Sequence, residues 1–406
     1  MADDDFDDGL VEGALPPETH EKAEPVALNE LLPWHTPRKW FIRRHQWGLW
    51  ASRLISKLRN RSSLQPGGDA LTKVRYLCLP GRDYLDVEEI SEICTSYGLE
   101  LEVTGFHDAY ARLPEMARAE MRQQALVEGK KISNRSETYW SKIEDFVQNK
   151  GTVKRQIEER GPFDIINLDA CGSIRPHSAR RRSLTKTLQS LISFQLHRSN
   201  TPWLLFVTVN VNIETLHPDV LAGFSEAIKT NANESEEFKA GVERLFESEH
   251  SLEDGMSAQM EKDGYELVRF FFLGLSKWLI HLTRESGWTV KTFRSYCYST
   301  TQRHDENIRL PSMPSLAFEF QPPPLTNLTD PFSVTERIDD LPLVQSNSGD
   351  KAICPSIRAL NEAYRFENLD RKLAEDDELR NSLRRDVISD LRRIGYKLSE
   401  HALSHI

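Results

Sequence analysis

Long apolar runs and paired cysteines are both scarce in this sequence of 406 residues. No apolar run reaches the roughly 20 residues that a membrane span needs, and the amino terminus is acidic, unlike a secretory signal peptide. The five cysteines are scattered and odd in number, with no CxxC pair or Cys/His cluster of the kind that binds zinc. We therefore predict a cytoplasmic protein with reduced thiols, no membrane segment and no metal site.

A glycine-rich phosphate loop and an overall positive charge are also missing. No GxGxxG follows any apolar run, which argues against a dinucleotide-dependent oxidoreductase. The formal net charge of −10 excludes a general polyanion binder. Any contact with nucleic acid therefore requires a local basic patch.

The net charge of the amino-terminal part of the chain changes abruptly from negative to positive. Residues 1–30 are rich in Asp and Glu and poor in large apolar side chains, which predicts a disordered acidic tail. Residues 31–70 predict a basic, Trp-rich arm that is helical from Pro37, followed by a linker. The candidate nucleic-acid contacts in this arm are Arg38, Lys39, Arg43 and Arg44.

The Trp residues of the arm leave two interpretations open. In the first, the cations bind phosphates while the indoles stack on bases. In the second, an apolar stripe docks on the main domain and the cations line its edge, which is the commoner outcome for such a stripe. The stripe consists of Trp40, Trp47, Leu49, Trp50, Leu54 and Leu58.

Residues 71–325 alternate between strand and helix patterns, which predicts an α/β fold: a doubly wound, mostly parallel sheet with an antiparallel C-terminal edge strand. The predicted strands are Val74–Leu79, Leu99–Phe106, Phe163–Leu168, Trp203–Val211, Trp288–Ser299 and Ser315–Gln321. The predicted helices are Asp86–Tyr97, with Asp86 as the N-cap, Leu113–Lys130, Ser183–His197 and Tyr265–Glu285. Between residues 131 and 160 the pattern indicates helix and no strand.

The C-terminal part is predicted to be a linker followed by helices. Residues 326–354 are rich in Pro, Asn, Asp and Ser and read as a linker. Residues 355–406 predict charged helices, the last with an apolar edge that packs on the body of the protein or on a protein partner.

The stretch GPFDIINLDACGSIRP, residues 161–176, carries the candidate chemistry. Its apolar run ends at Asp169, and an acid at the carboxyl end of a buried strand lies where open α/β sheets bind ligands. A helix N-cap is the plainer role for this acid, and a small buried apolar side chain is the plainer role for Cys171. The cations that follow either bind phosphate beside the site or form a solvated helix face. They are Arg175, Arg180, Arg181 and Arg182.

This order of elements resembles the class I, Rossmann-like S-adenosylmethionine-dependent methyltransferases. INLDACGS is similar to the Asp-Pro-Phe-Gly-Ser motif of the tRNA guanine N2-dimethyltransferases and, less closely, to the Asp-Ala-Pro-Cys motif of RNA cytosine C5-methyltransferases. The resemblance implies S-adenosylmethionine as cofactor, nucleic acid as partner, and Asp169 and Cys171 as catalytic candidates. The cofactor-binding residues that it implies are Pro80, Gly81, Asp83, Phe106, His107, Asp108 and Asp145.

The sequence departs from this family in ways that keep two functions open. The first loop has one glycine, Gly81, and the acid after the second strand, Asp108, stands two places late. The chain is then either a methyltransferase that acts on nucleic acid or a methyltransferase fold without catalysis that serves as a scaffold or binding subunit. The WHxPRKxxxRxxQW pattern of Trp34–Trp47 resembles chains from bacterial mobile or anti-phage loci, which implies a defence role.

Overall fold

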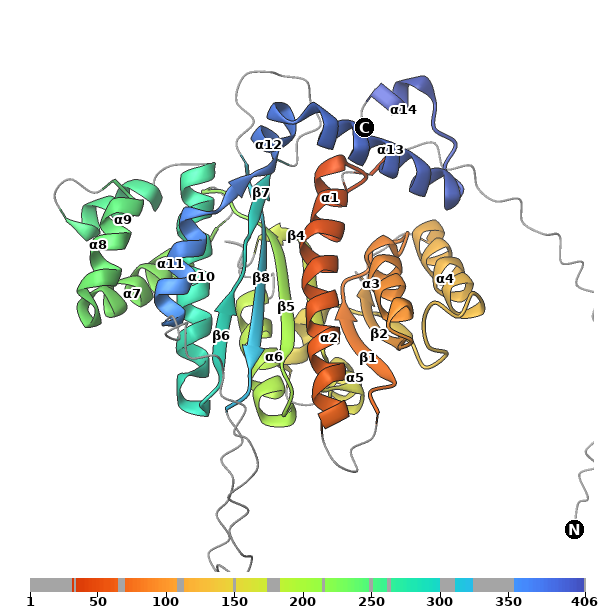
Figure 1. The fold of residues 1–406 in the computed structure, drawn as a ribbon, viewed down its shortest axis with the longest axis horizontal. Coiled ribbons are helices and arrows are strands. Elements are labelled where there is room, and N and C mark those ends of the chain that lie inside the picture. The colour runs from red at the N-terminus through yellow and green to blue at the C-terminus, as the bar shows by residue number, and fades with distance from the viewer. Residues whose placement is uncertain are drawn as a thin grey trace, which may run out of the picture.

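The computed structural model describes residues 31–32, 34–64, 70–107, 113–148, 151–173, 183–213, 216–247, 251–260, 264–299, 311–323 and 354–404. Within these residues nine strands form one sheet in the order β3-β2-β1-β4-β5-β8-β7-β9, with β6 also paired to β8 (Figure 1). β1 to β5 pair in parallel, and β8 is antiparallel to β5, β6 and β7. The predicted α/β class, with its antiparallel C-terminal edge, is confirmed.

The strands are short, and the carboxyl ends of β1 to β5 lie together at one edge of the sheet. They are β1 (Lys73–Cys78), β2 (Glu100–His107), β3 (Glu137–Trp140), β4 (Ile165–Ser173), β5 (Trp203–Asn210), β6 (Thr289–Thr292), β7 (Tyr296–Tyr298), β8 (Met313–Gln321) and β9 (Glu367–Asn368). β5 is buried from Trp203 to Val209 because helices cover both faces of the sheet. The register of the pairing between β4 and β5 shifts between Asp169 and Ser173, so the hydrogen bonds between these two strands are irregular after Asp169.

Helices cover both faces of this sheet (Figure 1), and each face forms a separate apolar core with the helices that cover it. α3 and α4 lie on one face, and α5, α6 and α10 lie on the other with α7 to α9 outside them. No helix in the described part of the chain is long and apolar enough to cross a membrane. The bounds are α3 (Leu85–Ser96), α4 (Leu113–Glu128), α5 (Thr152–Arg160), α6 (Leu184–Arg198), α7 (Pro218–Glu234), α8 (Glu236–Leu245), α9 (Leu252–Met260) and α10 (Tyr265–Thr283).

The basic arm is the first helix of the layer that contains α3 and α4. It runs without a break through α1 (Pro37–Phe41), a π-helical segment η1 (Ile42–Gly48) and α2 (Leu49–Leu64). The Thr36 hydroxyl accepts from the backbone N–H of Lys39, and Pro37 fills the first turn, where a missing N–H costs nothing. Trp40 and Trp47 are 2% and 1% exposed, so the apolar stripe docks on the main domain, with the exception of Leu49, which is 42% exposed.

The C-terminal segment is also built into the sheet and its helix layers. It comprises α11 (Pro355–Tyr364), β9, α12 (Leu369–Glu375), α13 (Asp377–Arg393) and α14 (Glu400–Ser404). β9 extends the sheet edge beside β7, α11 packs on α10, and α13 packs on α1. The apolar edge of α13 is therefore used within the chain, through Leu383, Val387 and Leu391. The predicted acidic tail and nearly all of the predicted 326–354 linker lie outside the described residues.

Three local predictions are wrong. β3 occupies Glu137–Trp140, where only helix was expected, because a four-residue, half-exposed strand has too little apolar pattern to be recognised. The strand expected over Trp288–Ser299 is divided into β6 and β7, two segments that pair separately with β8. α3 begins at Leu85 after Tyr84, whose φ is 54°, so Asp86 lies inside the first turn and is not the N-cap.

We expect Trp47→Ala to lower the free energy of unfolding by about 3–5 kcal/mol, because the indole is buried under the sheet and its removal leaves a large cavity. Chemical denaturation measures this change. Leu49→Ala is the matched control, since Leu49 lies on the same helix at 42% exposure and should change the free energy by about 0.5 kcal/mol or less. Equal effects of the two substitutions would mean that the helix does not dock in this way.

Candidate functional site

A cavity of about 830 Å³ lies at the carboxyl ends of the parallel strands. Its wall is formed by the segments that follow β1, β2 and β3, by the ends of β4 and β5, and by the first helix. In doubly wound sheets this edge is where ligands bind, since the loops diverge there and leave a crevice. The first helix adds a wall that the prediction did not assign to the cavity.

The cavity brings together most of the residues predicted for the cofactor. Its lining includes Pro80, Gly81, Asp83, Phe106, His107 and Asp169. Asp145, on the short helix η2 (Ile143–Val147), does not line it, whereas its neighbour Glu144 does. Asp108 lies outside the described residues, as do Arg175, Arg180, Arg181 and Arg182. Cys171 lies on β4, but its side chain is outside the description.

Asp169 is engaged by a lysine of the first helix. The Lys39 ammonium donates to Asp169 Oδ1 at 2.6 Å, and its side chain is 3% exposed against 23% for Asp169. The same ammonium lies 4.6 Å from the Trp47 ring centroid and 3.4 Å from the Tyr298 hydroxyl oxygen. Burial lowers the pKa of Lys39, but Asp169 and Tyr298 outweigh it, so the pKa lies above its ordinary value and the lysine is charged.

Arg43, one helical turn after Lys39, presents an incompletely bonded guanidinium in the cavity wall. Its side chain is 6% exposed, and neither Nε nor Nη1 has a hydrogen-bond partner among the described residues. The guanidinium carbon lies 4.6 Å from the Trp40 ring centroid, which fixes its plane. Lys39 and Arg43 were predicted to contact nucleic acid from the surface, but both are buried at the cavity.

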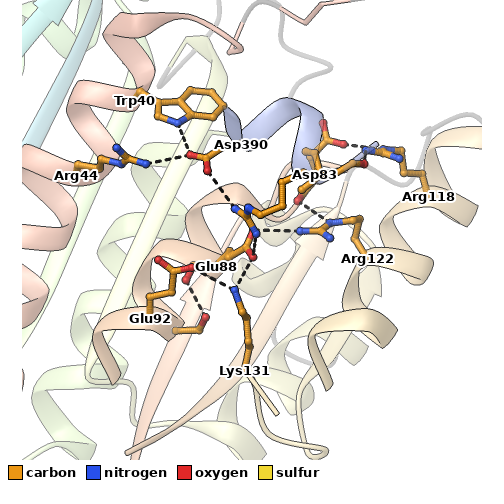
Figure 2. Close-up of polar contacts among 12 residues, drawn as sticks. Trp40, Arg44, Asp83, Glu88, Glu92, Arg118, Arg122, Lys131 and Asp390 are labelled. Atoms are coloured by element: carbon orange, nitrogen blue, oxygen red, sulfur yellow. Dashed lines mark hydrogen bonds and ion pairs between the residues drawn. The ribbon is translucent and has the colours of Figure 1, made fainter. Parts of the chain in front are cut away.

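The other two cations predicted to contact nucleic acid are paired with acids of the C-terminal helices. Arg38 bonds to Asp370, and Arg44 bonds to Asp386 and, at 3.0 Å, to Asp390. The Trp40 indole also donates to Asp390 at 2.8 Å (Figure 2). These cations hold the first helix against α12 and α13, so they do not form the expected open basic surface.

Asp83 is the centre of a second buried network. It accepts from Arg118 at 2.6 Å and from the Tyr396 hydroxyl at 2.8 Å, and His35 Nε2 lies 3.1 Å away (Figure 2 shows the Arg118 contact). Burial raises the pKa of Asp83, but His35 and Arg118 reverse the effect and hold it far below its ordinary value. Its carboxylate is thus already satisfied, and Asp86, whose carboxylate accepts from the Tyr76 hydroxyl at 3.0 Å, is the other acid at this wall.

Glu88, on α3, links this helix to α4, to the segment that follows α4 and to α13. It pairs with Arg122 at 3.2 Å, with Lys131 at 2.7 Å and with Arg393 (Figure 2). Burial raises the pKa of Glu88, and the hydrogen bonds from Arg393 and Lys131 more than offset this and lower it. The cavity wall is therefore held rigid by charged contacts that cross between three parts of the chain.

Two more unbonded polar atoms belong to residues that line the cavity. His107 stacks on Trp140 with ring centroids 4.6 Å apart, and its Nε2 has no hydrogen-bond partner among the described residues. Burial lowers the pKa of His107 to about 4, so the ring is neutral at pH 7. Asn210, at the end of β5, likewise has an unbonded Oδ1. Sequence reasoning missed Trp140, because β3 was missed, and Asn210, because a lone Asn after a strand is ordinary.

The strand order and the cavity at the strand ends define a Rossmann-like, doubly wound α/β fold. The chain belongs to the PP_RS20740-like family, whose model matches residues 28–404. No curated protein matches the chain.

Solved structures match the chain at low similarity. A Listeria monocytogenes protein designated a class I S-adenosylmethionine-dependent methyltransferase has 10% identity and a TM-score of 0.30, over 73% of this chain and 66% of its own. A Clostridium thermocellum protein designated an rRNA methylase has 6% identity and a TM-score of 0.26, over 66% and 96%. The CurJ carbon methyltransferase has 12% identity and a TM-score of 0.29, over 71% and 61%. The chain thus spans slightly less than two thirds of the Listeria and CurJ chains.

We expect Asp83→Asn to lower the free energy of unfolding at pH 7 by about 3–5 kcal/mol, because it leaves the largely buried Arg118 without its counter-charge. The folded-state pKa of Asp83 is depressed, so its contribution is present above the ordinary pKa of roughly 4 and is lost as the pH falls. Denaturation at several pH values should show that the difference in the free energy of unfolding between wild type and Asp83→Asn becomes smaller toward pH 3. The control is Glu92→Gln, because Glu92 is 58% exposed and pairs with Lys131 at the edge of the same charged network. If Asp83→Asn lowered the free energy of unfolding at pH 7 by no more than Glu92→Gln does, the account would be contradicted.

Proposed function

We propose that this chain binds S-adenosylmethionine in the cavity at the strand ends and is a methyltransferase-like protein that acts on nucleic acid. The observation that carries the proposal is a ring of buried polar atoms without hydrogen-bond partners among the described residues, around one cavity. They are Nε and Nη1 of Arg43, Nε2 of His107 and Oδ1 of Asn210. Because buried polar groups are normally bonded, such atoms mark places that a polar ligand completes.

The lining residues fit the parts of S-adenosylmethionine. The guanidinium of Arg43 suits the ligand carboxylate through paired N–H donors, and Asp86 offers an acceptor for the amine. His107 offers a neutral ring nitrogen to a ribose hydroxyl, while Phe106 and Trp140 provide flat apolar surface for the adenine. Gly81 lines the same cavity, and a Cβ at this position would meet nothing nearer than the Trp34 indole nitrogen at 3.7 Å. When bound, the cofactor supplies an electrophilic methyl group.

Asp169 is the residue of this chain best placed to orient a substrate amine at the cavity. Lys39 takes one acceptor position, on Oδ1, so the carboxylate keeps Oδ2 and further lone pairs for hydrogen bonds from a substrate. Arg175, Arg180, Arg181 and Arg182 follow β4 directly in sequence and are the proposed contacts to nucleic-acid phosphates, in place of the four cations of the first helix.

The Lys39–Asp169 ion pair favours a second candidate, a methyltransferase fold without catalysis that serves as a binding or scaffold subunit. The carboxylate of Asp169 holds a buried ammonium in place, a structural role that requires no substrate and no catalysis. A role in anti-phage defence would suit this candidate, and it rests on the Trp34–Trp47 pattern alone.

Titration calorimetry with S-adenosylhomocysteine and with 5′-methylthioadenosine, which lacks the amino-acid part, tests the cofactor proposal. Wild type should bind the homocysteine compound more tightly. Arg43→Gln should weaken the binding of S-adenosylhomocysteine by about 10–100-fold, which corresponds to the loss of one charged hydrogen bond. The affinity for 5′-methylthioadenosine should not change. Arg155→Gln, at a cation 71% exposed on α5, is the control. Absence of binding to wild type, or equal weakening of both ligands by Arg43→Gln, would contradict the proposal.

Transfer of radiolabelled methyl groups to total RNA or DNA separates the two candidates. An enzyme should label nucleic acid in the wild type and lose at least about 100-fold in rate in Asp169→Asn, if that carboxylate orients the substrate. Binding of the cofactor without any labelling would select the scaffold. If Asp169→Asn left the rate of labelling unchanged, Asp169 would have no role in orienting the substrate.

A further inference from the structure

A second cavity, of about 630 Å³, opens between α2 and α11 and shares no lining residue with the candidate site. Figure 1 shows these two helices flanking β5, β6 and β8, which supply the floor through Leu204, Lys291 and Glu319. We call this cavity the basic groove. It is lined on one side by Arg53 and Lys57 of α2, and on the other by Arg358 and Arg365.

Positive charge dominates the basic groove although the whole chain carries a net charge of −10. Its lining contains six cations and two acids. The cations are Arg53, Lys57, Lys291, Arg294, Arg358 and Arg365, and the acids are Glu319 and Glu362. Such local excess of one sign attracts a ligand of the other sign.

The internal acids neutralise only half of these cations. Lys57 pairs with Glu319, Arg294 pairs with Glu367, and Arg365 lies 3.6 Å from Glu362. Across the described residues, Arg53, Lys291 and Arg358 have no ion-pair partner. Burial lowers the pKa of Lys291, and Lys57 and Arg358 lower it further against the opposing effect of Glu319, which shows that these cations repel one another. A bound anion would relieve that repulsion.

The geometry of the basic groove suits an extended ligand with several phosphates. Arg53 and Lys57 lie one helical turn apart, and Arg358 and Arg365 lie two turns apart, so the facing rows are about 6 and about 10 Å long. Four of the six cations are arginines, whose planar fork matches phosphate oxygens. Trp50 stacks on Phe293 at 3.6 Å between centroids and carries the exposed Arg53 over its other face, so the stack presents a guanidinium plane of the kind on which bases stack.

We propose that the basic groove binds the phosphodiester backbone of a single-stranded nucleic acid. Phosphates contact both rows of cations, with Arg53, Lys291 and Arg358 as the anchors that no internal acid among the described residues occupies. The guanidinium plane of Arg53, held on Trp50, favours nucleic acid over a peptide of acidic residues, which offers no ring to stack on it. This site is independent of the cofactor cavity and of whether the chain transfers methyl groups.

Fluorescence anisotropy with a labelled oligothymidylate and an oligouridylate, each of about 20 nucleotides, tests the proposal across a salt series. Wild type should bind with a steep salt dependence. The triple variant Arg53→Gln, Lys291→Gln, Arg358→Gln should flatten the log–log slope by about 2, since each single-strand phosphate contact contributes about 0.7. The matched control is Lys154→Gln, Arg155→Gln, Arg244→Gln, which removes the same charge outside the groove and should leave the slope unchanged.

Circular dichroism and S-adenosylhomocysteine titration of both triple variants establish that the fold and the cofactor cavity are intact, so failure of this proposal is distinguishable from failure of the proposed function. Three results would overturn it: no salt-dependent binding by wild type, equal slopes for the two triple variants, or a polyglutamate peptide that binds the groove as tightly as the oligonucleotides do.

Discussion

One buried ion pair ties the first helix to the end of the central strand. Lys39 and Asp169 meet at 2.6 Å although the lysine is 3% exposed. Taking an ammonium out of water costs several kcal/mol, and here the carboxylate, the face of Trp47 and the Tyr298 hydroxyl offset that cost. The helix cannot leave the sheet without stranding one of the two charges. The position of every side chain that the first helix brings to the cavity, Arg43 included, depends on this contact.

The candidate site is consequently assembled from three distant parts of the chain. The first helix contributes the cationic wall, the turns after the strands contribute the ligand-facing backbone and rings, and the C-terminal helices hold the other two in place. Asp390 binds the first helix through Arg44 and Trp40, while Tyr396 and Arg393 reach Asp83 and Glu88 beside the first turn. These contacts pre-organise the cavity before any ligand arrives, which reduces the entropy lost on binding.

The sequence predicted the fold well wherever an apolar run was unbroken. The runs at 163–168 and 203–211 became the buried strands β4 and β5, because only a strand covered on both faces needs such a run. Short β3 gave no such signal. The cations of the first helix were misinterpreted because their acidic partners, Asp169, Asp370 and Asp386, lie 130 to more than 330 residues away. Pairing over that distance is set by the fold and leaves no trace in local spacing. The strand-end acid, Gly81 and His107 were nevertheless brought to one cavity, since the carboxyl ends of parallel strands share one edge.

The central claim is that the first helix is part of a ligand site at the strand ends. Amide hydrogen exchange of the full chain, with and without saturating S-adenosylhomocysteine, tests it most directly, because exchange reports local opening segment by segment. The account predicts slower exchange both at Lys39–Gly48 and at Gly81–Asp86 when the ligand is bound. Protection confined to the turns after the strands, or no protection in either segment, would contradict it.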